Sequence, residues 1–103
     1  MQLIKQLRQE FDAPRARFVC ATLGQTAKGA DGPEGQILEA QLAVDGSTGK
    51  YREFAGNVAT VYTHPLSKGG ASNGHYDGNA ETYMNVGEAM GQAMVNMLNA
   101  DSK

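Results

Sequence analysis

The residue types best suited to acid–base chemistry lie in the last third of the chain. His75 sits in the glycine-containing run Asn73-Gly74-His75-Tyr76-Asp77-Gly78, directly before a long amphipathic segment. Because a histidine changes charge near neutral pH, it can move protons at such a position. As a functional residue, His75 would act as a general base that takes a proton from a serine hydroxyl and returns it to a leaving group. The alternative is an exposed loop histidine with no role.

The second histidine and the single cysteine offer weaker chemistry. His64 directly follows a predicted strand, but no nearby residues have the spacing of metal ligands. We therefore expect no metal site and no cofactor, and a structural role for His64. Cys20 is the only cysteine, which excludes an internal disulfide and a multi-cysteine zinc site. Its place within an apolar run predicts a buried, inert thiol.

The run Gly24-Gln25-Thr26-Ala27-Lys28-Gly29 superficially resembles a phosphate-binding loop. Such a loop ends in Gly-Lys-Ser/Thr, which places a lysine on phosphate and a hydroxyl on magnesium. Here Lys28 precedes Gly29, and Ala30 follows, so no nucleotide site is expected. Because this loop follows a strand, where ligands bind in open α/β sheets, we expect Gly24 and Gln25 to line a substrate cleft.

Composition and charge restrict the partners of the chain. The 103 residues are 41% hydrophobic and carry a net charge of -2 with both signs interspersed, which is typical of a globular domain that does not bind nucleic acid. No apolar stretch is long enough to span a bilayer, so no membrane partner is expected, and residues 1–20 lack a signal-peptide core. A complete chain of this kind would be soluble and cytoplasmic, whereas a fragment could have lost an upstream export signal.

Apolar periodicity and capping signals divide the chain into five elements. We predict a helix over 1–11, a strand over 18–23, a helix over 31–44, a strand over 58–62 and a helix from 80 onward. The order α-β-α-β-α predicts an α/β fold in which the two strands are parallel and joined by a right-handed crossover. The unbroken apolar run 18–23 is typical of a strand buried on both faces.

Two features of this arrangement indicate that the sheet has further strands. Two strands make too small a sheet for helices on both faces, so we expect further strands outside these residues. The buried helix faces are predicted at two sets of positions: Ile37, Leu38, Leu42 and Val44 in the middle helix, and Tyr83, Met84, Val86, Met90, Met94 and Met97 in the last. If upstream strands are absent, the methionine stripe would be exposed and would promote self-association.

The stretch His75-Tyr76-Asp77-Gly78-Asn79-Ala80-Glu81-Thr82-Tyr83, with the helix that continues to Leu98, resembles the C-terminal end of the sialate O-acetylesterase-like carbohydrate esterases. These enzymes belong to the SGNH (GDSL-like) hydrolases. The preceding elements follow the order of that family's last third, so the resemblance covers almost the whole chain. It implies a three-layer α/β/α flavodoxin-like fold, of which residues 1–103 would form the C-terminal portion of a single domain.

The resemblance also implies an activity. It implies a serine carbohydrate O-acetylesterase, which hydrolyses acetyl esters on sugars such as sialate or xylan, with His75 in the position of the catalytic histidine. We expect Asn73 and Tyr76 to line the substrate cleft beside it. The serine and oxyanion blocks of the family are absent from this sequence, and Ser72 occupies the position where many relatives carry an acid. The chain would therefore need a complementing N-terminal segment.

A second interpretation stays open beside the esterase. The chain could be a small non-catalytic α/β module that binds a partner, or a second copy of itself, through the methionine stripe or the loop over 63–78. Loops of that length without secondary structure are usually functional, whether in catalysis or in binding. This interpretation predicts that the loss of His75 has no effect.

Overall fold

A computed structural model describes residues 1–70 and 72–101, with the backbone alone at 72, 73 and 101. The elements within this part are α1 (Gln2–Glu10), β1 (Phe18–Ala21), α2 (Gly32–Ala43), β2 (Val58–Val61) and α3 (Ala80–Asp101), with short 3₁₀ helices at Arg52–Phe54, His64–Leu66 and Ser72–Gly78. The predicted α/β class and the order α-β-α-β-α are confirmed. The loop expected over 63–78 contains the last two of these 3₁₀ helices.

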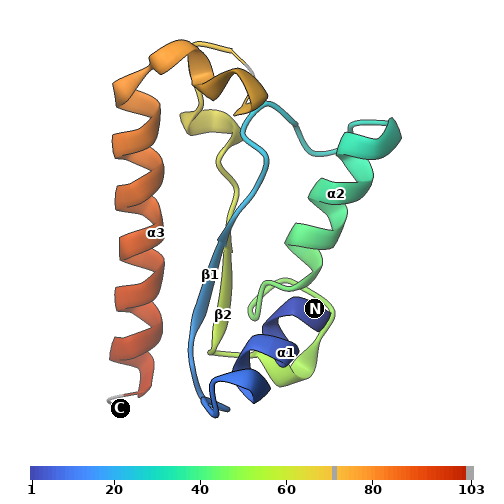
Figure 1. Cartoon of the computed structure of the whole chain (residues 1–103), viewed down its shortest axis with the longest axis vertical. Coiled ribbons are helices and arrows are strands. Elements are labelled where there is room, and N and C mark those ends of the chain that lie inside the picture. Colours follow the sequence, from blue (N-terminus) through green and yellow to red (C-terminus); the bar gives the residue numbers. More distant parts are fainter. Residues whose placement is uncertain (71, 102–103) are drawn as a thin grey trace.

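The two strands form a parallel pair, as predicted, with Phe18 opposite Val58 and Ala21 opposite Val61. In Figure 1, α3 lies on one side of the strands, and α1 and α2 lie on the other. β1 is two residues shorter than predicted, although the Thr22 amide still donates to the Val61 carbonyl (3.0 Å). The backbone ladder stops there because the Thr63 amide donates to the side-chain oxygen Oγ1 of Thr22 (3.0 Å) and not to a backbone carbonyl of the neighbouring strand. The amide of Leu23 donates to Oε1 of Gln41 on α2 (3.1 Å).

The outer edge of β2 is sealed by the turn that follows α2. The Gly46 amide donates to the Val58 carbonyl (2.8 Å), and the Thr60 amide donates to Oδ1 of Asp45 (2.8 Å). The other carboxylate oxygen of Asp45 accepts hydrogen bonds from the amides and hydroxyls of Ser47 and Thr48. One carboxylate therefore closes the turn and satisfies an edge amide of the strand.

The buried apolar core lies between α1, α2 and the strands. Ile4, Val44, Phe54 and Val58 form one buried cluster, and Phe18 packs against it. Only part of the predicted buried face of α2 is confirmed, because Leu38 is 1% exposed whereas Ile37 is 48% exposed. All four residues of β1 are only half-buried, so the prediction of a strand buried on both faces is wrong. The reason is that β1 has a neighbouring strand on one side alone within the described residues.

The predicted stripe of α3 is also only partly buried. Met97 is buried against the sheet, whereas Met84 is 73% exposed and Tyr83 is 49% exposed. A helix on a two-stranded sheet covers little width, so the flanks of its apolar face remain in solvent. Cys20 is half-buried rather than fully buried, and this burial raises the pKa of its thiol. Among the described residues, no helix is long and apolar enough to cross a membrane.

Candidate functional site

The carboxyl ends of β1 and β2 are joined by a pair of threonines. Thr22 follows β1, and Thr63 lies two residues beyond β2; each is at most 5% exposed. The Thr63 amide donates to Oγ1 of Thr22 (3.0 Å), and Oγ1 of Thr63 donates to the Thr22 carbonyl (2.9 Å). This clamp brings the two loops that follow the strands together, at the edge of the sheet where α/β proteins bind ligands.

Gly24 is the point at which three segments meet. Nδ1 of His64 lies 2.9 Å from the Gly24 carbonyl. Since a carbonyl oxygen can only accept, Nδ1 must carry the hydrogen, and in the neutral ring Nε2 is then the acceptor. A Cβ at position 24 would overlap Oγ of Ser67 and Oη of Tyr76. Glycine therefore permits the close approach of these two side chains, which a larger residue would displace, and the predicted cleft residues Gly24 and Tyr76 are in contact.

His75 lies in a turn of unusual handedness. His75, Tyr76 and Asp77 have φ values of 55°, 52° and 53°, within the 3₁₀ segment Ser72–Gly78. Non-glycine residues visit this left-handed region as single residues, because the side chain crowds the backbone there at a cost of roughly 1–2 kcal/mol each. Three in succession are strained, and such strain is concentrated at ligand and catalytic sites.

The backbone of this turn is held by the start of α3. Oη of Tyr83 donates to the His75 carbonyl (3.0 Å), and the Tyr83 and Tyr76 rings meet edge to face with their centroids 5.6 Å apart. The Asn79 amide donates to the Tyr76 carbonyl (3.0 Å). The His75 side chain itself is exposed, and none of the described residues hydrogen-bonds its imidazole. The main chain is thus anchored while the ring faces solvent.

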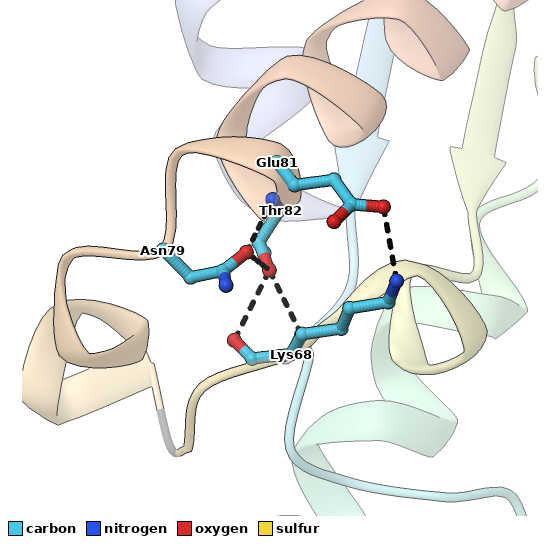
Figure 2. A network of polar contacts seen from close by, with 4 residues as sticks. All are labelled: Lys68, Asn79, Glu81 and Thr82. Carbon is cyan, nitrogen blue, oxygen red and sulfur yellow. Dashed lines mark hydrogen bonds and ion pairs between the residues drawn. The ribbon is translucent and has the colours of Figure 1, made fainter.

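A buried polar network fixes the start of α3 to the segment after β2 (Figure 2). Thr82 is fully buried, and its hydroxyl oxygen accepts from the Lys68 amide (2.8 Å). The Thr82 amide donates to Oδ1 of Asn79 (2.9 Å), so Asn79 is the helix N-cap. Lys68 Nζ and Glu81 add an exposed ion pair (2.9 Å). The two ends of the loop that carries His75 are therefore tied to each other.

The remaining predicted residues are less closely placed. Gln25 is half-buried in the loop after β1. The side chains of Asn73 and Ser72 lie outside the described part. Within that part, no three His, Cys, Asp or Glu side chains lie close enough to hold a metal ion.

Sequence reasoning missed two sets of residues at this edge. The clamp of Thr22 and Thr63 could have been predicted, because a threonine closely follows each strand in the sequence. Ser67 lies where a side chain at position 24 would be. The sequence gives no indication of this contact, because it depends on how the loop after β2 folds back.

Comparisons with known proteins add no relative to this description. No family model matches the chain, and no curated protein or solved structure matches it significantly. A proposed function therefore rests on the sequence resemblance of residues 75–98 and on the chemistry and placement of the residues themselves.

Proposed function

We propose that this chain is the C-terminal segment of a serine carbohydrate O-acetylesterase of the SGNH type, with His75 as its catalytic base. The position of His75 carries the proposal. Its backbone is anchored by Tyr83, its imidazole is exposed, and its loop follows β2 and leads into α3 at the carboxyl ends of two parallel strands. In this proposal, the two strands and the helices on both sides belong to a larger three-layer, flavodoxin-like sheet.

The proposed reaction needs one proton carrier and one nucleophile. Nε2 of His75 takes the proton of a serine hydroxyl, and the serine oxygen attacks the acetyl carbonyl carbon. When the ester C–O bond breaks, His75 gives this proton to the departing sugar oxygen. A water molecule then hydrolyses the acetyl-serine, again with His75 as base. The serine and the donors that stabilise the oxyanion come from polypeptide outside residues 1–103.

The isolated chain lacks the serine and the oxyanion donors that the proposed reaction needs. A positioned histidine without a nucleophile or an oxyanion hole lacks the largest contributions to acyl transfer. We therefore expect the 103-residue chain alone to hydrolyse aryl acetates no faster than background. Gly24 and Tyr76, which touch beneath the loop, would form one wall of the cleft for the acetylated sugar.

The test uses the protein as it occurs in its source cells. An antibody against residues 63–103 would report its size on an immunoblot and capture it for labelling with a fluorophosphonate, a reagent that modifies activated serines. We expect a band several-fold larger than 10.9 kDa and strong labelling. His75→Gln should abolish the labelling, whereas the matched variant His64→Gln should retain it, because His64 is engaged by the Gly24 carbonyl.

Two results would overturn the proposal. A labelled protein that loses labelling in His64→Gln and keeps it in His75→Gln would assign the base to the other histidine. A band at 10.9 kDa with no labelling would favour the second candidate, a non-catalytic module that associates with itself. The exposed apolar side chains Leu3 and Ile37, which lie beside each other around one groove, favour that candidate.

A further inference from the structure

The left-handed turn that carries His75 is held at two successive carbonyl groups. Oη of Tyr83 donates to the His75 carbonyl (3.0 Å). The Asn79 amide donates to the carbonyl of the next residue, Tyr76 (3.0 Å). A Cβ at position 69 would overlap this second carbonyl oxygen, so the backbone of Gly69 packs directly against the turn. The contact from Tyr83 comes from a side chain, so a substitution can remove it and leave the main chain unchanged.

Tyr83 is itself held in place by the residue before it. Thr82 is fully buried, and its hydroxyl accepts from the Lys68 amide, which fixes the first turn of α3 to the segment after β2 (Figure 2). The Tyr83 ring meets the Tyr76 ring edge to face, at an interplanar angle of 81°. Tyr83 is 49% exposed, so it lies at the rim of the fold. Its hydroxyl can therefore be removed without opening a cavity in the core.

The turn depends on the contacts around it. His75, Tyr76 and Asp77 all have positive φ, a conformation that residues with a Cβ adopt at an energetic cost. Such a conformation persists where the surrounding contacts over-determine it. Without the hydrogen bond from Tyr83, the peptide group after His75 rotates more freely and the turn can relax toward negative φ. The exposed imidazole of His75 then moves with the backbone, because none of the described residues hydrogen-bonds the ring.

We propose that Tyr83 is a positioning residue of the proposed esterase, and that its hydroxyl holds the turn that presents His75 to the serine. This inference rests on the proposed function and adds a residue that acts through His75 alone. Because a displacement of about 1 Å can slow an enzymatic reaction roughly 100-fold, loss of the hydroxyl should lower kcat by about 10- to 100-fold. KM should stay nearly unchanged, because Tyr76 keeps its contacts with Gly24 and with the aromatic ring at position 83.

The test uses the protein at its native length, expressed in its source cells and captured with the antibody against residues 63–103. Tyr83→Phe keeps the ring but lacks the donor. In aryl acetate hydrolysis, we expect kcat to fall about tenfold or more and KM to change less than about twofold. The melting temperature should stay the same, because water can satisfy the exposed His75 carbonyl without tying it to α3.

Tyr62→Phe is the matched control. Tyr62 lies just after β2, and its hydroxyl accepts a hydrogen bond from the Lys28 amide (2.8 Å), so it does not hold the turn. This variant loses one tyrosine hydroxyl, as Tyr83→Phe does, but should keep its kcat. A rescue variant replaces Tyr83 by 4-aminophenylalanine. Its para NH₂ group can donate to the His75 carbonyl in place of the hydroxyl, so kcat should recover.

The outcomes separate this inference from the proposed function. If His75→Gln abolishes hydrolysis and Tyr83→Phe keeps its kcat, the positioning role is overturned and the proposed function stands. The role is also overturned if Tyr62→Phe lowers kcat as much, or if 4-aminophenylalanine restores nothing. A lower melting temperature or a raised KM in Tyr83→Phe would assign the hydroxyl to the fold or to substrate binding instead. If His75→Gln leaves hydrolysis unchanged, the proposed function fails and this inference fails with it.

Discussion

Asp45 offers the clearest prediction about the stability of this fold. Its partial burial alone would raise the pKa of the carboxyl group. Hydrogen bonds from the Thr60 amide and from Ser47 and Thr48 outweigh the burial and lower the pKa from 3.8 to about 2. Because the pKa is lower in the folded chain than in the unfolded chain, the charged carboxylate stabilises the fold above pH 3.8. That stabilisation is lost as the pH falls from 3.8 toward 2.

The size of this contribution follows from the shift. Each unit of pKa corresponds to 1.36 kcal/mol, which would give at most about 2.4 kcal/mol. Since Asp45 is only half-buried, solvent screens its interactions, and we expect about 1–2 kcal/mol. Asp45→Asn keeps the shape but turns an amide NH₂ toward either the Thr60 amide or the Ser47 and Thr48 donors. One donor group then loses its acceptor, which also costs about 1–3 kcal/mol.

Urea unfolding followed by circular dichroism would measure both effects. At pH 7, Asp45→Asn should lower the free energy of unfolding by about 2 kcal/mol. The difference between the original chain and the variant should stay constant down to about pH 4 and shrink toward pH 2. Asp31→Asn is the matched control: Asp31 is exposed and makes no side-chain cap, so this change should be nearly neutral. A difference that does not vary between pH 4 and pH 2 would refute the reasoning.

Substitutions at three further positions test the loop that carries His75, each by urea unfolding. Thr82→Val keeps the shape of the side chain but leaves the buried Lys68 amide without its acceptor. It should lower the free energy of unfolding by about 1–3 kcal/mol. An unchanged free energy of unfolding would mean that water replaces the hydroxyl. Gly24→Ala forces apart the Ser67 and Tyr76 side chains that meet at this position. It should lower the free energy of unfolding by about 1–3 kcal/mol and speed proteolysis within 63–78. Normal proteolysis would argue against the contact. Asp77→Gly should stabilise the fold and Asp77→Val destabilise it, each by about 1 kcal/mol, because glycine adopts φ 53° without strain and a β-branched residue adopts it least readily. Effects of equal sign would exclude the left-handed turn.

Local signals predicted the elements well. α2 and α3 begin within one residue of the predicted starts at 31 and 80. Pro33 lies in the first turn of α2 and Asn79 caps α3, and such boundaries depend on neighbouring residues only. The parallel pairing of the strands also followed from local information, since a strand-helix-strand connection leaves little alternative.

Burial was predicted less well, because it depends on what surrounds each element. Ile37 and Met84 have the spacing of buried residues but lie exposed, at 48% and 73%, since a two-stranded sheet has too little area to cover them. The site was likewise only partly predictable. The position of His75 after the second strand could be read from the chain, whereas its left-handed conformation and the contact between Gly24 and Tyr76 depend on how distant loops pack.

The sealed edge of β2 sets a limit on growth. The Val58 carbonyl and the Thr60 amide are occupied by Gly46 and Asp45, so a further strand cannot use them and the sheet cannot grow through these groups. Acid that protonates Asp45 weakens only the hydrogen bond from the Thr60 amide. The hydrogen bond from the Gly46 amide to the Val58 carbonyl does not depend on pH, so this edge stays partly closed in acid.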